Sequence, residues 1–389
     1  MKYAWGSAAA LPEWLGVPNP GAEPWAELWI GAHPRASSSI QTADGESSLV
    51  TWIGSDPRRA LGEAVAERFD GRLPFLLKVL AVEAPLSLQL HPAGPQAARG
   101  YADEERRGVP LASPDRIFAD PWAKPELIVA VSPFAALCGL LDDETVATLW
   151  EPLPCSLPPA LACAASAAER LRALFELRSE DRNRVASELI RGCDNLASRG
   201  QAYADVSMLA RRYPADPGCA APLLLQRHAL KPGEALFLEP GQIHCYLSGS
   251  GVELMASSDN VLRAGLTQKP IRPDLVLELL DVSSRKQETI RPVRVADGRF
   301  AYPASCEEFQ LERITLDGTS GTSLPTTGGP ELLLVYEGTV SLPNAPGDIA
   351  LQRGQAAFLT AERPEAVLGG SGVAFWARVG THTEVPDNR

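Results

Sequence analysis

The stretch from Leu86 to Pro92 alternates strictly between apolar and polar side chains. In an extended strand, residues two apart point to the same side, so three leucines form an apolar row opposite a polar row of Ser87, Gln89 and His91. A polar row that faces an interior would line a cavity, and imidazole with oxygen donors suits zinc or iron. A strand solvated on one face shows the same alternation. Taken alone, the pattern leaves a metal site and a plain surface strand open.

Around this stretch the pattern predicts one helix and several strands. Asp56 followed by Pro57 marks a helix start, and apolar residues recur at every fourth position until Gly71 ends the segment. We therefore expect a single helix here. Strands are expected at residues 73–80, 86–91 and 126–131.

A helical insertion is predicted between residues 142 and 212. This segment is rich in Ala, Leu, Glu and Arg, with apolar residues at helical spacing, and Ser179 before two acidic residues is expected to be an internal N-cap. The insertion contains no histidine, so its own residues favour a plain amphipathic bundle without chemistry.

An internal repeat lies beyond Asp216, where short strands and Pro-Gly turns return. Residues 230–238 match residues 351–359 at five of nine positions, with a constant offset of 121 and no gap. A repeat this distant indicates two related β-barrels rather than a solenoid, whose period is about 20–50 residues. A chance similarity of two glycine-containing strands is the alternative. His244 falls opposite Glu365, so the second copy is expected to be structural.

Composition and charge narrow the class of protein. The 389 residues are 45% hydrophobic, as in an ordinary globular protein of two or three domains. A net charge of -12 argues against nucleic acid or an anionic membrane as partner, although a local cationic pocket could still bind a small anion. The N-terminus lacks the apolar core of a signal peptide and no run could span a bilayer, so a cytoplasmic location is expected. Seven scattered cysteines, without a C-x-x-C pair, indicate reduced, buried thiols rather than disulfides or a thiolate zinc site.

A second alternating strand completes a candidate metal site. Residues 239–247 read as a turn followed by a strand on which His244 and Tyr246 share one face. A barrel interior lined by Gln89, His91, Glu126 and His244 would offer two imidazoles, one carboxylate and one amide oxygen. One or two coordination positions would remain for water or substrate, as in a catalytic site rather than a closed structural one.

Eight segments resemble one family, the type I mannose-6-phosphate isomerases. They are residues 3–7 (YAWGS), 26–34 (AELWIGAHP), 73–80 (LPFLLKVL), 85–92 (PLSLQLHP), 124–126 (KPE), 134–139 (FAALCG), 241–249 (GQIHCYLSG) and 258–269 (SDNVLRAGLTQK). The resemblance covers the whole length, including the helical insertion. It implies a mainly β fold with an α insertion, built from two cupin-type (jelly-roll) β-barrels and an α-helical domain. The implied domains are a catalytic barrel at 1–140 and 217–285, a helical domain at 141–216, and a metal-free barrel at 286–389.

The resemblance also implies an activity and a set of site residues. The activity is the interconversion of mannose 6-phosphate and fructose 6-phosphate with one zinc ion per chain, held by Gln89, His91, Glu126 and His244. Catalytic roles fall to Arg263, Lys124, Glu253 and Asp259, with Glu253 and Lys124 as candidate proton carriers between C1 and C2 and Asp259 helping to open the ring. The implied substrate-binding residues are Trp5, Glu27, Lys78, Ser87, Tyr246 and Lys269.

Several of these residues have a plainer interpretation. Without the resemblance, Lys124, Lys269 and Arg263 would read as solvated surface charges, and Trp5 and Trp29 as packing residues. His33 is expected to hold a backbone group, and His228 and His382 receive no role. Many members of the family have a histidine just before Lys-Pro-Glu, whereas Ala123 stands here. The proton route is therefore less defined than the metal site.

Two other functions remain as alternatives. Two histidines and one carboxylate can form an iron site, which would make the chain a metal-dependent oxygenase of the same barrel class. The same pocket could also serve a non-catalytic sugar-phosphate sensor. We expect a small-molecule partner and a monomer, with a homodimer as the alternative.

Overall fold

The computed structural model describes residues 1–42, 45–153, 156–214, 216–283, 285–343 and 349–380; Cys155 and His382 lie outside them. The helices are α1 (Ala10–Leu15), α2 (Leu49–Ser55), α3 (Pro57–Leu61), α4 (Glu63–Arg68), α5 (Gly94–Arg106), α6 (Asp143–Trp150), α7 (Pro159–Ala162), α8 (Ala167–Phe175), α9 (Ser179–Leu196), α10 (Gln201–Arg212) and α11 (Pro273–Leu279), with 3-10 turns η1 (Ala197–Arg199) and η2 (Pro217–Leu223). The strands are β1 (Glu27–Ile30), β2 (Ser39–Thr42), β3 (Gly45–Ser48), β4 (Phe75–Val82), β5 (Leu88–Leu90), β6 (Glu126–Ala130), β7 (Phe134–Leu140), β8 (Leu225–Leu230), β9 (Ala235–Leu238), β10 (His244–Ala256), β11 (Leu262–Gly265), β12 (Val293–Ala296), β13 (Arg299–Tyr302), β14 (Gln310–Asp317), β15 (Thr322–Leu324), β16 (Glu331–Leu342), β17 (Ile349–Gln352), β18 (Ala356–Leu359) and β19 (Ala366–Arg378).

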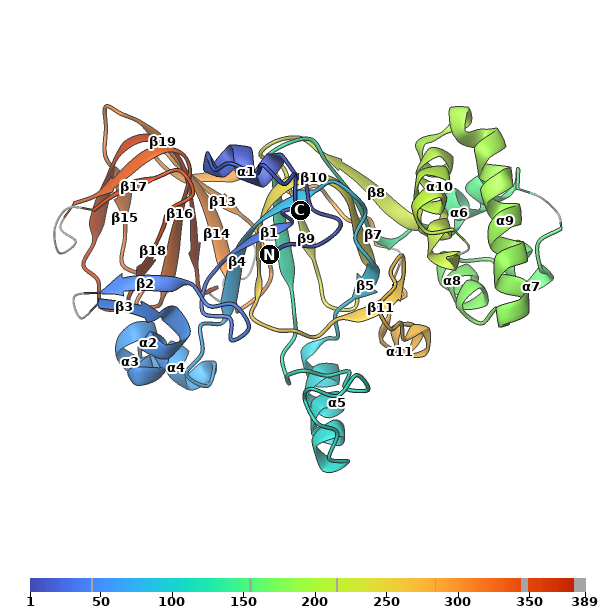
Figure 1. Cartoon of the computed structure of the whole chain (residues 1–389), viewed down its shortest axis with the longest axis horizontal. Helices are drawn as coiled ribbons and strands as arrows, with labels where there is room; N and C mark the ends of the chain where they lie inside the picture. The colour runs from blue at the N-terminus through green and yellow to red at the C-terminus, as the bar shows by residue number, and fades with distance from the viewer. Residues whose placement is uncertain (43–44, 154–155, 215, 284, 344–348, 381–389) are drawn as a thin grey trace, which may run out of the picture.

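Two large antiparallel sheets dominate the molecule. The first contains β1 and β4 to β11, and the second contains β12 to β19. Figure 1 shows the second sheet at one end, the first in the middle and α6 to α10 at the other end. The fold is mainly β with a helical insertion, as the sequence predicted. Among the described residues, neither sheet closes on itself through its strand pairs.

The long strand β10 organises the first sheet. Its first residues pair with β7 and β5, whereas its last residues pair with β4 and β6. The pairing with β7 shifts register between Tyr246 and Ser248, and Gly249 follows with φ of +113°. A Cβ at Gly249 would lie 2.5 Å from the Pro133 carbonyl oxygen. Glycine therefore lets β10 bend here and bring its two halves to different neighbours.

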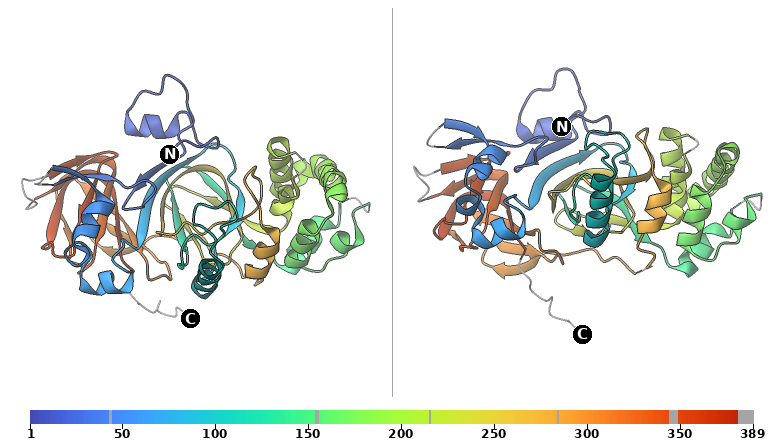
Figure 2. Two further views of the ribbon diagram at one scale, coloured as in Figure 1. Left: turned by 60° about the horizontal axis from the view of Figure 1, so that its bottom comes forward. Right: turned by 90° about the horizontal axis from the view of Figure 1, so that it is seen from below.

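Apolar cores join these parts into one body. One core packs α6 and α8 to α10 against β5, β7 and β11, and another packs α2 to α4 against both sheets. All eight residues of β4 are buried, which is typical of a strand covered on both faces. Figure 2 shows α2 to α4 alongside the second sheet although they come early in the chain. The first sheet is thus held from both sides.

The internal repeat is visible as corresponding strands. An offset of 121 relates β9 to β18, and β10 overlaps β19 at the same offset. The bend glycine of β10 also has its counterpart, because Gly370 in β19 has φ of +102° and would place a Cβ 2.2 Å from the Thr339 carbonyl oxygen. The two copies therefore share strand positions and a glycine with positive φ at which the long strand bends.

Two local predictions are wrong. The single helix expected up to Gly71 is two helices, α3 and α4, separated by Gly62 at φ of +81°. A Cβ at Gly62 would lie 2.5 Å from the carbonyl oxygen of Gly328, between β15 and β16, so this non-helical position needs glycine. Ser179 is the first helical residue of α9, and the N-cap is Arg178. The strands expected at residues 73–80, 86–91 and 126–131 are present, with ends shifted by a few residues.

The run of helices predicted between residues 142 and 212 is confirmed. Its first helix is capped by Asp142, whose side chain accepts a hydrogen bond from the Thr145 N–H. No helix in the described part of the chain combines the length and the apolar character that crossing a membrane requires.

We expect Gly249→Ala to destabilise the protein by about 1–3 kcal/mol, because alanine would be strained at this φ and its Cβ would clash with backbone. Urea unfolding of wild type and variant would measure the change. Gly54→Ala is the matched control, since Gly54 lies in helix α2 with nothing within 4 Å of an added Cβ. This control should gain about 0.5–1 kcal/mol. An equal effect of both substitutions would contradict the strained bend.

Candidate metal centre and anion-binding cavity

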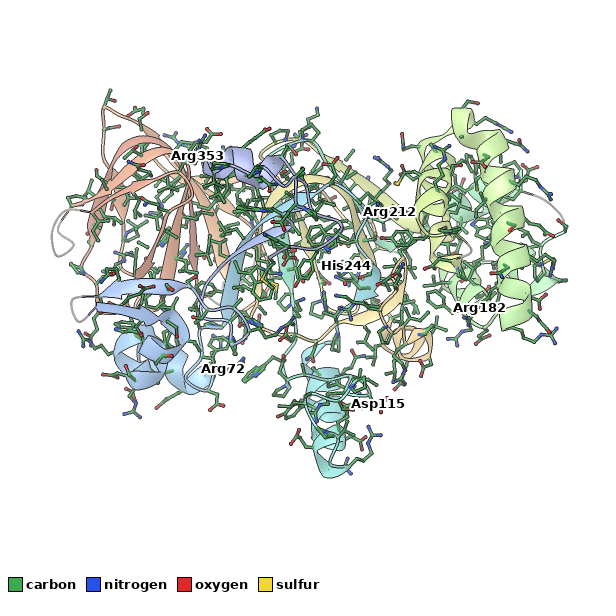
Figure 3. The ribbon with its side chains drawn as sticks, in the orientation of Figure 1. Arg72, Asp115, Arg182, Arg212, His244 and Arg353 are labelled. Carbon is green, nitrogen blue, oxygen red and sulfur yellow. The ribbon has the colours of Figure 1, made fainter. Side chains whose placement is uncertain are left out.

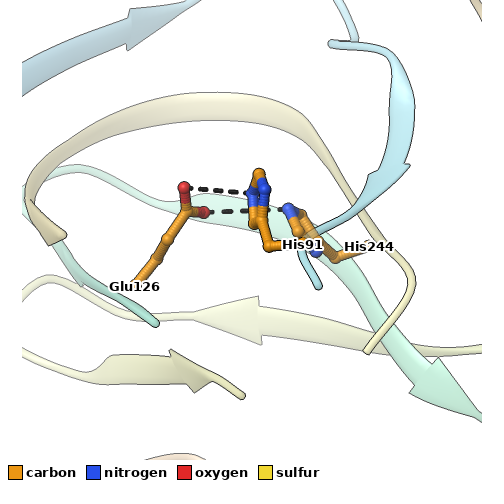
Figure 4. A group of neighbouring side chains, drawn as sticks. All are labelled: His91, Glu126 and His244. Atoms are coloured by element: carbon orange, nitrogen blue, oxygen red, sulfur yellow. Dashed lines mark ion pairs between the residues drawn. The ribbon is translucent and has the colours of Figure 1, made fainter. Parts of the chain in front are cut away.

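Three buried side chains from three strands converge in the first sheet. Glu126 is the first residue of β6, His244 is the first of β10, and His91 directly follows β5. The Nε2 atoms of His91 and His244 lie 3.2 Å and 3.7 Å from the two carboxylate oxygens of Glu126. Each residue is 3% exposed or less. Figure 4 shows both rings turned toward the carboxylate, and one atom from each residue lies within 4.8 Å of the others.

Backbone hydrogen bonds set the orientation of both imidazoles. His91 donates its Nδ1–H to the Asn260 carbonyl oxygen at 2.6 Å, and His244 donates its Nδ1–H to the Gln242 carbonyl oxygen at 3.0 Å. Each ring then presents the lone pair of Nε2 toward Glu126. His91 Nε2 is buried without a hydrogen-bond partner. Two nitrogen lone pairs that face one carboxylate form a set of ligands that could hold a divalent metal ion.

The charge states agree with this interpretation. Burial, together with the Lys124 cation, lowers the pKa of His91 to about 4, and burial lowers the pKa of His244. Burial alone would raise the pKa of Glu126, but Lys124 at 3.2 Å and the two imidazoles hold that pKa well below its usual range. Near neutral pH the cluster therefore offers two neutral imidazoles and one carboxylate. These are the protonation states in which such groups bind metal.

Gln89 lies beside this cluster on the cavity side. It is opposite His244 in the β5–β10 pairing, and its Nε2 lies 3.4 Å from His244 Nε2. Ser87 donates its hydroxyl hydrogen to Gln89 Oε1 at 3.1 Å. A half-turn of the carboxamide would place its oxygen toward the same point as the imidazole nitrogens. The amide is therefore within reach of an ion held by the other three groups.

One cavity of about 550 Å³ collects most of the residues singled out in the sequence. Twelve of the fourteen line it, and the other two, His91 and His244, lie behind Gln89 and Glu126. Those twelve are Trp5, Glu27, Lys78, Ser87, Gln89, Lys124, Glu126, Tyr246, Glu253, Asp259, Arg263 and Lys269. Figure 3 places His244 in the middle of the molecule, with Arg212 between it and the helices.

A second carboxylate sits deep in the cavity between a lysine and a tyrosine. Lys78 Nζ lies 3.1 Å from Glu253 Oε2, and Tyr246 donates its hydroxyl hydrogen to Glu253 Oε1 at 2.9 Å. Burial raises the pKa of Glu253; Lys78 opposes this shift, and the negative charges of Glu126 and Glu27 add to it. A carboxylate with a raised pKa is suited to proton transfer near neutral pH.

A third carboxylate lies nearer to solvent. Asp259 accepts from His33 Nε2 at 3.4 Å and from an Arg35 guanidinium nitrogen at 3.1 Å. Burial opposes ionisation, but His33 and Arg35 outweigh it and lower the pKa of Asp259. His33 also accepts the Arg35 backbone N–H at its Nδ1, as expected for a residue that holds backbone. Asp259 and Glu253 therefore differ in environment, one favouring ionisation and the other opposing it.

Four further cationic side chains line the cavity, namely Arg35, Arg212, Arg263 and Lys269, and all but Arg263 are exposed to solvent. Burial and the neighbouring guanidinium groups of Arg263 and Arg35 lower the pKa of Lys269, and burial and Arg35 lower that of Arg263. Neighbouring cations that lower one another's pKa values favour the binding of an anion between them. A local cationic pocket in an acidic chain agrees with the sequence expectation.

Two of these cations were missed in the sequence. Arg35 directly follows the segment 26–34, and its position next to that segment was the available signal. Arg212 ends α10, and it lines the cavity with its neighbour Tyr213. The insertion, which the sequence predicted to be a plain bundle without chemistry, thus contributes residues to the wall of the cavity. Lys124 is 7% exposed, so the surface interpretation of this lysine is also wrong.

Comparisons with known proteins agree with this geometry. Residues 1–142 match the family model for the type I phosphomannose isomerase catalytic domain. The chain is 37% identical over 381 residues to mannose-6-phosphate isomerase of Escherichia coli (strain K12), covering 96% of each chain. It is 32% identical over 398 residues to the human enzyme of that name, covering 93% of this chain and 92% of that one. A zinc-bound crystal structure of mannose 6-phosphate isomerase superposes with a TM-score of 0.89 at 32% identity, covering 98% of this chain and 97% of that chain.

We expect Arg263→Gln to weaken the binding of inorganic phosphate about tenfold, because a charge-assisted hydrogen bond contributes about 1.5–3 kcal/mol. Isothermal titration calorimetry would measure the dissociation constant. Arg291→Gln is the matched control, since the Arg291 side chain is 83% exposed and does not line the cavity. Equal phosphate affinity in wild type and Arg263→Gln would contradict an anion site at the outer part of the cavity.

Proposed function

The chain belongs to the type I phosphomannose isomerase family, and we propose that it interconverts D-mannose 6-phosphate and D-fructose 6-phosphate in this cavity. The observation that carries the proposal is that Glu126 of the His91–Glu126–His244 cluster lines the same cavity as the four cations. An anion at the outer end and a cluster of metal-binding type at the inner end suit an elongated sugar phosphate. The chemical change then occurs at the end of the sugar remote from the phosphate.

The phosphate would bind to Arg35, Arg212, Arg263 and Lys269. Arginine guanidinium groups match phosphate oxygens in pairs, and lysine adds a point charge. The sugar would then extend inward toward Gln89 and Glu126, which line the cavity. Fixing the phosphate restricts where C1 and C2 can lie, and orientation of this kind contributes directly to rate.

The metal ligands would be Gln89, His91, Glu126 and His244. The zinc ion would supply Lewis acidity for the substrate oxygens O1 and O2 without redox chemistry. Lys124 adds a buried cation next to Glu126, 3.2 Å from its Oε1. That charge favours negative charge developing on the sugar oxygens.

Proton transfer needs a group to open the ring and a group to carry a proton between carbons. Asp259 stays ionised beside His33 and Arg35, so it can accept a hydroxyl proton during ring opening. Glu253 would take the proton from C2 of mannose 6-phosphate and return it to C1, so that an enediolate forms and collapses to the ketose. Lys124 is the other candidate carrier. Ala123 offers no titratable side chain before Lys124, so our candidates are these two residues.

We also infer the domain division from the repeat. The catalytic cupin-type barrel would comprise residues 1–140 and 217–285, the helical domain residues 141–216, and the second, metal-free barrel residues 286–389. The offset of 121 between β9 and β18 supports two copies of one β domain. The proposed enzyme would act in the cytoplasm as a monomer.

Removing the metal should remove the activity. We expect about one zinc per chain in the purified protein, and a chelator should abolish formation of fructose 6-phosphate in a coupled assay until zinc is added back. His244→Ala should lose zinc and activity together. Gln89→Leu should weaken both. Full activity in protein shown by metal analysis to contain no metal would overturn the proposal.

His228→Ala is the matched control for His244→Ala. His228 is also a buried histidine of the first sheet, but its Nε2 lies 3.4 Å from the Cys138 carbonyl oxygen and it does not belong to the cluster. This variant should keep its zinc. Iron with oxygen uptake would instead favour an oxygenase, and tight sugar-phosphate binding without turnover would favour a sensor.

Lys78→Met should move the acidic limb of the kcat/KM profile to higher pH. Activity rises with pH as the general base loses its proton, and the Lys78 cation lowers the pKa of Glu253. Removing that cation raises the pKa of Glu253, so a higher pH is needed for ionisation. Lys231→Met, which changes an exposed lysine, should leave the limb in place. An unchanged limb in Lys78→Met would remove Glu253 as the base.

A further inference from the structure

The orientation of His91 depends on a backbone carbonyl in another segment. His91 donates its Nδ1–H to the Asn260 carbonyl oxygen at 2.6 Å, and both residues are buried. This bond directs Nε2 toward Glu126 and fixes the plane of the ring. The position of residue 260 therefore determines where this nitrogen points.

The Asn260 side chain holds that position through a dense set of hydrogen bonds. Its Nδ2 donates to the Asp120 carbonyl oxygen at 2.8 Å, to Asp120 Oδ1 at 3.1 Å and to the Trp122 carbonyl oxygen at 2.9 Å. Its Oδ1 accepts the Ala119 N–H at 2.8 Å. Carboxamides combine two N–H donors with an acceptor, which this arrangement uses in full. Asn260 is 1% exposed, so losing these bonds would leave buried backbone groups unpaired.

Asp120 also accepts hydrogen bonds from the two residues that precede Asn260. It accepts the Asp259 N–H at 2.9 Å and the Ser258 hydroxyl at 2.8 Å, and it also accepts the Trp122 N–H at 3.1 Å. The loop from 119 to 122 continues directly into Lys124 and Glu126. One hydrogen-bonded junction therefore connects the segment that orients His91, the cavity carboxylate Asp259, and the loop that leads to Glu126.

We propose that Asn260 is a positioning residue for His91, held by Asp120, and that this junction sets the affinity of the site for its metal ion. The proposal rests on the proposed zinc-dependent function. Asn260 acts through its carbonyl oxygen and touches neither substrate nor metal. Substitution of its side chain leaves the carbonyl in the chain but releases it from its fixed place. Residues that orient metal ligands typically change metal affinity 10–100-fold when replaced.

The test is the zinc dissociation constant, measured by competition with a fluorescent chelator, for wild type, Asn260→Ala and Asp120→Asn. We expect a 10–100-fold weaker affinity for Asn260→Ala and a smaller loss for Asp120→Asn, which removes fewer bonds. The absorption spectrum of the cobalt-substituted protein gives a second measurement, because its d–d bands report ligand geometry. These bands should change in Asn260→Ala.

A matched control separates ligand positioning from general loss of stability. Glu312→Gln removes a buried charge in the second sheet, where Glu312 pairs with Arg299 and Arg378 away from the cavity. It should lower the thermal midpoint without changing zinc affinity or the cobalt spectrum. Unchanged zinc affinity in Asn260→Ala, or the same loss in Glu312→Gln, would overturn the positioning role while the enzyme assignment stands. A wild-type protein that binds no zinc would overturn both.

Discussion

The architecture of the first sheet depends on one buried negative charge. Glu126 is 3% exposed and ionised, and taking a carboxylate out of water costs several kcal/mol unless opposite charge and hydrogen bonds compensate. Lys124 supplies one cation at 3.2 Å. The remaining oxygen positions face the Nε2 atoms of His91 and His244, which are not protonated near neutral pH. Lys124 therefore compensates the charge of Glu126, and the two imidazole nitrogens remain free to bind a metal ion beside it.

The second sheet has a corresponding buried carboxylate, Glu331, which pairs with an arginine. Glu126 pairs with Leu238 of β9, and Glu331 pairs with Leu359 of β18, which is Leu238 shifted by the repeat offset. Glu331 is fully buried, like its counterpart, but Arg363 contacts its carboxylate at 2.7 Å and Trp376 donates its Nε1–H at 2.9 Å. In the second sheet, the cation that faces the buried carboxylate is therefore an arginine side chain. The structural role predicted for the second copy, from the absence of a counterpart to His244, stays a prediction, and the buried Arg363–Glu331 pair supports it.

The sequence pattern predicted the structure correctly where the arrangement depends only on residues that are close in the chain. The alternation in residues 86–92 placed Gln89 and His91 together, and the resemblance added cavity residues that no local pattern could connect. Gly62 shows the limit, because it separates α3 from α4 and packs against the Gly328 carbonyl oxygen in a distant part of the chain. Arg212 was missed for the same reason, because the sequence at the end of a helix does not indicate which cavity that end contacts. The partnership of His91 with Asn260 likewise joins segments that are remote in sequence.

The helical insertion is part of the cavity as well as an addition to the sheet. At the C-terminal end of the insertion, Tyr213 donates its hydroxyl hydrogen to the Pro85 carbonyl oxygen at 2.9 Å. Pro85 lies shortly before β5, the strand that carries Gln89. Asp216 then accepts the Leu266 N–H at 2.6 Å and holds that residue at φ of +55°. Gly265 leaves room for this carboxylate, because a Cβ there would lie 2.8 Å from Asp216 Oδ1. Since Lys269 follows this turn, the insertion fixes both a cation of its own and the loop that carries another.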